Sequence, residues 1–202
     1  MIEFRRAQTE DEMIAMYKLR YEVYCLEKRY LNADDYPDQL EHDEWDKYSV
    51  HFIATDGTDI VGTVRLIKDS PIGFPTELLF DIARSNIHNK SIAEVSRLIV
   101  NPQFKSLTLQ IANGLYKVML NFSIEEGITH WYAVMDKHLY VAYSRIGFTF
   151  EQIGESKHCF GCNNSPYVLS LEESLANLKV VNTRMYNFLT ESHEKGMVGV
   201  IE

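Results

Sequence analysis

The sequence predicts a single α/β domain, residues 1–202, in which a mixed central sheet is flanked by helices on both sides. Along the chain, short segments typical of strands are followed by longer segments with helical periodicity. The short segments are either wholly apolar or alternate between apolar and polar residues. An Asp56-Gly57 pair joins two of the apolar runs and indicates an antiparallel hairpin. The length of 202 residues suits one hydrophobic core.

The composition is that of a globular protein, with 46% hydrophobic and 24% charged residues. No apolar run approaches the roughly 18 residues of a membrane-spanning helix, so we expect no integral membrane segment. Residues 1–6 lack the apolar stretch of a secretory signal, so we expect a cytoplasmic protein. A net charge of -9 argues against nucleic acid as a partner. Three cysteines, an odd number, do not form a disulfide framework.

The first half of the chain begins with a strand over residues 2–7. Thr9 and Glu12 form a capping box that opens a helix, and Arg20 falls on its inward-facing stripe. The alternative for Arg20 is a position at the helix edge with its charge in water. A loop rich in turn residues follows at 32–38. Then come the two strands of the hairpin, 50–54 and 59–67, and a connection over 71–80 that packs on the sheet.

The second half is predicted from the same signals, with Gly127 and Gly147 ending two helices and Ser170 capping a third. A tail from residue 196 is expected to be weakly determined. The expected elements are a strand at 94–100, a helix at 107–126, a strand at 130–135, a helix at 139–146, strands at 148–153 and 166–171, and a C-terminal helix at about 172–192.

The strand at 94–100 carries charges into an apolar run. In a regular strand Glu94 and Ser96 point to one face, and Val95 and Arg97 point to the other. Removing the partner of a buried charge costs roughly 3 to 5 kcal/mol, so partners are expected nearby. The candidates are Arg20, Arg65 and the carboxylates of residues 41–46.

Two polar groups have alternative interpretations. The acidic residues Glu41, Asp43 and Asp46 lack the glycine and distal glutamate of a calcium loop, so we predict no metal site there. Cys159 and Cys162 could ligate zinc or form a redox pair, but no second cysteine pair exists. We therefore predict a loop at this place, before the last strand.

A series of residues, in order and at sensible gaps, resembles the acyl-homoserine-lactone synthase family. The series is Arg20, Tyr24, Tyr30, Glu41-x-Asp43-x-x-Asp46, Arg65 and Glu94-x-Ser96-Arg97. Residues 20–27 and Asp46-x-x-Ser49-x-His51-Phe52 more closely resemble N-acyl amino acid synthases and exosortase-system-associated acyltransferases. The resemblance covers about residues 1–155. Both groups are similar in fold to the GNAT acyltransferase superfamily, which implies a GNAT-like domain.

The resemblance implies an enzyme that moves a fatty acyl group from acyl carrier protein, or from coenzyme A, to the amine of an amino acid or similar acceptor. Glu94 is the candidate base for the amine, and the alternative is a structural partner of Arg97 or Arg65; both roles are compatible. Tyr143, four residues before Gly147-Phe148, is where GNAT enzymes place the tyrosine that protonates the departing thiolate. Its alternative is simple packing.

Arg97 is the third catalytic candidate, and the remaining candidates are expected to bind substrate. Arg20, Asp43, Asp46, Arg65 and Arg97 are expected to form an ion network over the acceptor site, where Arg65 or Arg97 pairs with an acceptor carboxylate. The resemblance adds Tyr24, Tyr30 and Ser96. An apolar slot for the acyl chain is expected to be lined by Val100, Leu115, Met119, Phe122 and the strand at 148–150. The alternative is that these residues are ordinary core.

Two departures from the family patterns stand out. Tyr30 occupies the place of a tryptophan in the lactone synthases. Residues 101–106 lack the glycines with which GNAT enzymes hold the pyrophosphate of coenzyme A, which favours acyl carrier protein as the donor. Acyl carrier protein is acidic, so we expect a basic patch that binds it. The candidates for this patch are Arg97, Lys105, Lys117, Lys137 and Arg145. We predict no tightly bound cofactor.

Two other functions remain open from the sequence. The first is a true acyl-homoserine-lactone synthase that uses S-adenosylmethionine and releases methylthioadenosine. The second is a non-catalytic module that binds acyl carriers or lipids.

Overall fold

The computed structural model describes residues 1–83 and 90–191. Their contacts divide them into two compact units. The first unit contains residues 1–66 and 97–119, and the second contains residues 67–83, 90–96 and 120–191.

The first unit is built on neighbouring strands in the order β1, β2, β3, β4. Strand β1 runs antiparallel to β2, from the pair Ile2 and Asp56 to the pair Arg6 and Phe52. Gly57, with a φ of 61°, and Thr58 form the tight turn between β2 and β3, so the predicted hairpin is confirmed. The strands are β1 (Ile2–Arg6), β2 (Ser49–Asp56), β3 (Asp59–Ile67) and β4 (Ile92–Val100).

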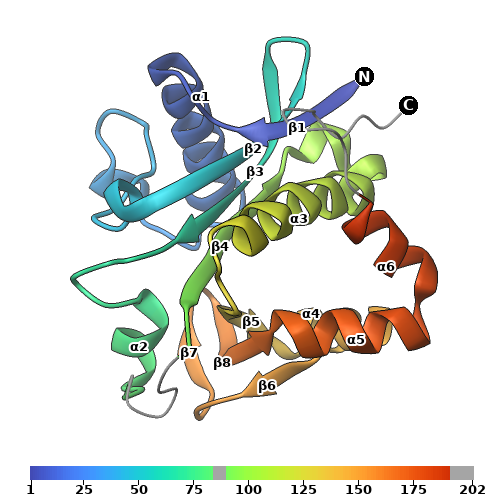
Figure 1. The fold of residues 1–202 in the computed structure, drawn as a ribbon. Helices are drawn as coiled ribbons and strands as arrows, with labels where there is room; N and C mark the ends of the chain where they lie inside the picture. Colours follow the sequence, from blue (N-terminus) through green and yellow to red (C-terminus); the bar gives the residue numbers. More distant parts are fainter. Residues whose placement is uncertain (84–89, 192–202) are drawn as a thin grey trace. The chain divides into compact units, whose positions relative to one another are not determined.

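Two long helices cover the strands of the first unit on opposite faces (Figure 1). They are α1 (Glu10–Tyr21), which opens with the predicted capping box of Thr9 and Glu12, and α3 (Thr108–Glu125). Helix α1 continues as a π-helical turn, η1 (Glu22–Glu27), closed by the N–H of Lys28 donating to the carbonyl of Val23 at 2.8 Å. Short 3₁₀ turns complete the unit: η2 (Ala33–Asp35), η3 (Asp46–Tyr48) and η5 (Pro102–Leu107).

The core of the first unit brings both helices against the sheet. Leu19 of α1 and Val23 of η1 pack on Ile99 of β4. On α3, a side chain at Gly114 would collide with the ring of Phe4 on β1. The close approach of helix and strand therefore requires a glycine at this position.

The second unit contains the first part of β4, followed in hydrogen-bonded order by β5, β8 and β6, while β7 pairs with β8. Strand β5 lies antiparallel to β8 from His130–Ser170 to Asp136–Asn164. Its parallel register with β4 runs only from Ile92–His130 to Val95–Ala133. The strands are β5 (His130–Asp136), β6 (Phe150–Gln152), β7 (Lys157–Cys159) and β8 (Cys162–Ser170).

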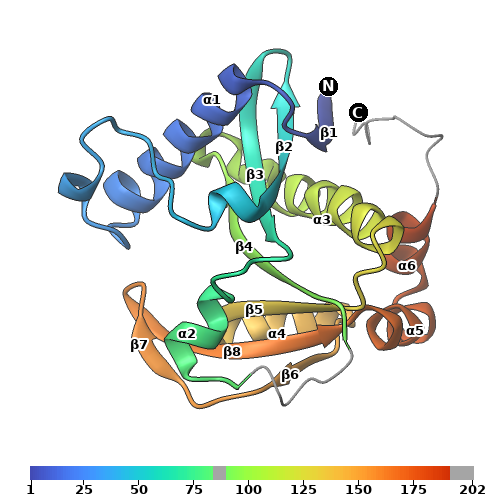
Figure 2. The same cartoon turned by 60° about the vertical axis from the view of Figure 1, so that its left-hand side comes forward.

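Four helices belong entirely to the second unit. Helix α2 lies on one face of the β5 and β8 pair, and α4 and α5 lie on the other (Figure 2). Helix α4 begins at its cap, Asp136, and ends at Gly147, whose φ is 116°, as predicted. The helices are α2 (Pro75–Phe80), α4 (Lys137–Ile146), α5 (Leu171–Val181) and α6 (Thr183–Thr190).

The structure corrects several of the sequence predictions. The single C-terminal helix at about 172–192 is two helices, because Asn182 leaves the helical conformation at a φ of -149° and its side chain caps α6 through the N–H of Met185. The connection at 71–80 contains the helix α2. The loop predicted around Cys159 and Cys162 is the tight turn of the β7–β8 hairpin, with Phe160 at a φ of 52°. The tail from residue 196 lies outside the described residues.

None of the helices in residues 1–83 and 90–191 is both long and apolar enough to cross a membrane.

Candidate active site

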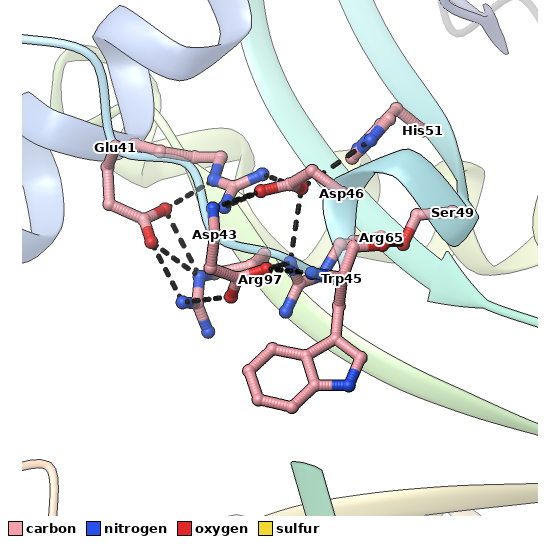
Figure 3. A network of polar contacts seen from close by, with 9 residues as sticks. Glu41, Asp43, Trp45, Asp46, Ser49, His51, Arg65 and Arg97 are labelled. Atoms are coloured by element: carbon pink, nitrogen blue, oxygen red, sulfur yellow. Dashed lines mark hydrogen bonds and ion pairs between the residues drawn. The ribbon is translucent and has the colours of Figure 1, made fainter. Parts of the chain in front are cut away.

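Six charged side chains of the first unit, four of them buried and two partly exposed, form one network, which we call the ion cluster (Figure 3). They come from α1, from the loop before η3, from the first residue of η3, from β3 and from β4. The members are Arg20, Glu41, Asp43, Asp46, Arg65 and Arg97.

Arg20 is the best-enclosed member, with 0% of its surface exposed. Its Nε donates to Glu41 Oε2 at 2.5 Å, and its Nη1 and Nη2 donate to the two oxygens of Asp46 at 2.7 and 3.2 Å. All three of its nitrogens are thus engaged by carboxylates, and Tyr17 lies beneath the guanidinium, with its ring centroid 5.2 Å away. Arg20 therefore does not lie at the helix edge with its charge in water, which was the alternative for this residue.

Arg97 and Arg65 complete the ion cluster. Arg97 Nη2 donates to Glu41 Oε1 at 2.8 Å and to Asp43 Oδ2 at 3.1 Å, while its Nε reaches both oxygens of Glu41 at 3.1 and 3.2 Å. Arg65 Nη1 donates to Asp43 at 2.5 Å and to Asp46 at 3.1 Å. Three guanidinium groups thus face three carboxylates, and their formal charges cancel.

The pKa values of the ion cluster follow from this pairing. Burial acts to raise the pKa of Glu41 and of Asp46, but their arginine partners outweigh it and hold both values below the usual range. Burial likewise opposes the charge of Arg97, and the carboxylate of Glu41 more than compensates, so the pKa of Arg97 is raised. Glu41, Asp46 and Arg97 are therefore charged near neutral pH.

The structure thus brings together Arg20, Asp43, Asp46, Arg65 and Arg97, the five residues that the sequence analysis assigned to one network. Two further residues contact these five and were not assigned to the network, although Glu41 was among the candidate partners at residues 41–46. Glu41, with 0% of its surface exposed, is the carboxylate shared by Arg20 and Arg97. Its position at the head of the Glu-x-Asp-x-x-Asp series was the available signal.

His51 is the second missed residue. It is buried on β2, and its Nε2 lies 3.5 Å from Asp46 Oδ1, while its ring meets that of Tyr17 edge-on, with 6.0 Å between centroids. Burial lowers the pKa of His51 to about 4, so the ring is neutral at neutral pH. The spacing of five residues after Asp46 was a weak signal that sequence reasoning used only for the family resemblance.

The neutral His51 predicts a loss of stability in mild acid. The unfolded chain takes up a proton near pH 6.5, whereas the folded protein resists until about pH 4, so stability falls as the pH drops through this window. Between pH 7.5 and pH 5 we expect His51 to account for about 2 kcal/mol of the decrease in unfolding free energy. Urea titrations at the two pH values should show a smaller decrease for His51→Phe. The same substitution at the exposed His138 is the control, and an unchanged decrease in His51→Phe would refute this assignment.

Two tyrosines border the ion cluster. The guanidinium of Arg97 lies over the ring of Tyr24 at 5.5 Å, and the ring of Tyr24 contacts that of Tyr30 at 6.1 Å. Tyr30 is exposed, whereas burial raises the pKa of the Tyr24 hydroxyl above its ordinary value. Tyr24 thus lies beside Arg97, which is expected to act in catalysis, and Tyr30 lies beside Tyr24.

Glu94 lies in the second unit, with 2% of its surface exposed. Its Oε2 accepts a hydrogen bond of 2.9 Å from the backbone N–H of Thr76, in the first turn of α2. In the parallel register Glu94 is paired with Tyr132 of β5, which is also buried. The hydrogen bonds of Arg97, in contrast, go to Glu41 and Asp43 of the ion cluster.

The strand that carries these residues changes conformation between them. The pairing of β4 with β5 ends at Val95, and Arg97 adopts the left-handed conformation, with a φ of 55°. A non-glycine residue in this region interrupts the pleat in the manner of a bulge. The strict alternation predicted for residues 94–97 therefore ends at Arg97. Ser96 and Val100, the other strand candidates, are both partly buried.

Tyr143 lies on α4 in the second unit. Its ring contacts those of Phe148 and Phe150, each at 5.8 Å between centroids. Among the residues considered for an acyl slot, Leu115 and Met119 are wholly buried. Lys117 is also buried and cannot belong to a basic surface patch, whereas Lys105, Lys137 and Arg145 are exposed.

The described part of the chain holds no group of three or more His, Cys, Asp or Glu side chains arranged to bind a metal ion. Cys159 and Cys162 stand opposite each other at the β7–β8 turn as free thiols.

The sequence matches a known protein family over most of its length. The family model described as "N-acyl amino acid synthase FeeM" matches residues 15–172. No curated protein matches the sequence significantly.

Solved structures with similar folds include FeeM, an N-acyl amino acid synthase from uncultured soil microbes. It is 18% identical, with 88% of this chain and 95% of FeeM covered and a TM-score of 0.67. BjaI, a CoA-dependent acyl-homoserine lactone synthase solved with SAM and isopentyl-CoA, is 20% identical over 92% of this chain and 90% of its own, with a TM-score of 0.73. An acyl-CoA N-acyltransferase from Pseudomonas aeruginosa is 18% identical over 84% of this chain and 100% of its own, with a TM-score of 0.58. The fold is therefore GNAT-like, as predicted.

Proposed function

The chain belongs to the FeeM family of N-acyl amino acid synthases and is thus an N-acyltransferase, and we propose that it transfers a fatty acyl group from acyl carrier protein to the amine of an amino acid or similar acceptor. The observation that carries the mechanism is the buried carboxylate of Glu94, which is fixed by a backbone N–H just before β4 leaves β5.

Glu94 is proposed as the base. An α-amino group has a pKa near 8 and is mostly protonated at neutral pH, so it must lose a proton before it can attack a thioester. Glu94 takes this proton, directly or through a water molecule. The attack converts the thioester carbonyl into a tetrahedral oxyanion, and we assign backbone N–H groups of β4 near Arg97, where the ladder with β5 has ended, to stabilise it.

Tyr143 is proposed to protonate the departing thiolate. The oxyanion then collapses, the carbon–sulfur bond breaks, and the attacking nitrogen gives up its remaining extra proton, which restores the Tyr143 hydroxyl and leaves an amide on the acceptor. The hydroxyl belongs to a ring that is held between Phe148 and Phe150, which restricts its movement.

Arg97 is the arginine best suited to meet an acceptor carboxylate. Its side chain is 17% exposed, against 1% for Arg65, and it uses Nε and Nη2 for Glu41 and Asp43. Its Nη1 donates to none of the described residues and supplies one hydrogen bond to an acceptor. The other members of the ion cluster then hold Arg97, and Tyr24, Tyr30, Ser96 and Val100 complete the substrate-binding set.

Acyl carrier protein is favoured over coenzyme A by the turn after β4. Asn101 already engages two backbone N–H groups there: its Oδ1 accepts from Gln103 at 3.0 Å and its carbonyl accepts from Phe104 at 2.8 Å. A pyrophosphate would need such groups, whereas the single phosphodiester of a phosphopantetheine arm needs fewer.

The test is mass spectrometry of purified protein with a palmitoyl donor and a mixture of the common amino acids. Reactions contain palmitoyl-acyl carrier protein or palmitoyl-CoA, each at the same concentration. An N-acyl amino acid formed faster from the carrier protein supports the proposal, and its mass identifies the acceptor. Exclusive use of CoA would overturn the donor assignment. Addition of S-adenosylmethionine tests the lactone alternative, because release of methylthioadenosine would replace the proposed function with lactone synthesis.

A further inference from the structure

The short helix α2 contributes a backbone group to the candidate base. The N–H of Thr76 donates to Glu94 Oε2 at 2.9 Å, and both residues are buried. Thr76 is the second residue of the helix, after Pro75, so its N–H has no carbonyl partner within α2 and is available to the carboxylate. The Thr76 hydroxyl, in contrast, makes no hydrogen bond with any described residue.

The first turn of α2 is fixed by its own contacts. Glu77 Oε2 accepts a hydrogen bond of 3.1 Å from the N–H of Phe74, which closes the turn on itself. The buried ring of Phe74 meets that of Tyr132 edge-on at 5.7 Å between centroids. Tyr132 is the register partner of Glu94, so the same strand pair supports the carboxylate and the turn that holds it.

The far end of α2 is held as well. The ammonium group of Lys157, on β7, donates to the carbonyl of Leu79 at 2.8 Å and to Asp81 at 2.7 Å. These contacts are exposed and contribute little stability, but they restrict rotation of the helix. Contacts of other residues therefore hold both ends of the segment that carries the Thr76 N–H.

We propose that Thr76 is a positioning residue for the proton transfer, acting through its backbone N–H on Glu94. This inference rests on the proposed function, in which Glu94 is the base. The hydrogen bond favours the ionised carboxylate, which alone can accept a proton, and gives it one orientation. Two further titratable residues belong to these elements: Glu77, which follows Thr76 on α2, and Tyr132, the register partner of Glu94 on β5.

The test moves the proline of this turn forward by one residue. Pro75→Ala is the reference. Pro75→Ala/Thr76→Pro removes the N–H that reaches Glu94 together with the Thr76 side chain, and the second residue of a helix tolerates proline. The initial rate of N-acyl product formation is measured from pH 5 to pH 9. Loss of the hydrogen bond should move the acid limb of kcat/KM upward by about one unit, which lowers the rate by about tenfold at pH values well below the limb.

The controls separate the possible failures. Thr76→Ala keeps the N–H and should leave the acid limb in place. If the wild-type protein forms no N-acyl product, the proposed function fails; if the reference is active and the proline variant has the same acid limb, the positioning role is overturned. Should the proline variant not fold, the Thr76 amide proton in the wild-type protein decides by NMR, since its chemical shift must titrate with the acid limb. A shift that does not vary with pH would overturn the proposal.

Discussion

Replacing Arg20 with leucine should lower the free energy of unfolding by roughly 3 to 5 kcal/mol, the cost of removing one partner from a buried ion pair. Arg20 donates three hydrogen bonds, to Glu41 and Asp46, and all three side chains are buried. Leucine fills much of the volume but leaves two carboxylates short of the charge that keeps them ionised. Urea unfolding at pH 7.5 measures the difference.

The control for this prediction is another arginine in an ion pair of similar length. Arg5 Nη2 lies 2.6 Å from Glu12 Oε1, with 32% and 20% of the two side chains exposed. Because water screens this pair, Arg5→Leu should cost about 1 kcal/mol or less. Equal losses for the two variants would mean that the ion cluster contributes no more than a surface contact.

Glu94→Gln should slow N-acyl transfer by a factor of about 10² to 10⁴ while leaving the protein folded. The glutamine keeps a carbonyl oxygen that accepts the hydrogen bond from Thr76, so the contact with α2 is conserved in shape. What is lost is the basic carboxylate that takes the proton of the amine. Product formation is followed by mass spectrometry at saturating acceptor, and thermal unfolding checks the fold.

Glu151→Gln, which makes the same change on an exposed residue of β6, is the activity control. A Glu94→Gln enzyme as fast as this control would remove Glu94 from the mechanism. A slow enzyme with a lowered melting temperature would instead indicate a structural role for the carboxylate.

Local signals predicted much of the fold. The capping box at Thr9, the Asp56-Gly57 turn and the stop at Gly147 each depend on the conformation of a few adjacent residues, and all three were found. The family resemblance was confirmed for the same reason, since it depended on residue types at fixed spacing. The same spacing assigned five residues of the ion cluster to one network, because charged residues that enter an apolar run require partners.

Features that depend on distant contacts were missed. The turn at Phe160 lacks the usual asparagine or aspartate, so its left-handed backbone could not be foreseen. The break at Asn182 falls within an apolar pattern that continues from Leu178 to Met185. The hydrogen bond from Thr76 to Glu94 joins residues 18 apart through a backbone group, which leaves no trace in side-chain chemistry.

The π-helical turn η1 has a consequence for insertions and deletions. A π-helical turn accommodates one residue more than an α-helical turn, so a chain shorter by one residue within Glu22–Glu27 could continue α1 as a regular helix. Each residue of an α-helix turns the chain by about 100°, and the ring of Tyr24 would then no longer lie under the guanidinium of Arg97. Homologous sequences should therefore keep the length of this segment constant more strictly than its residue types.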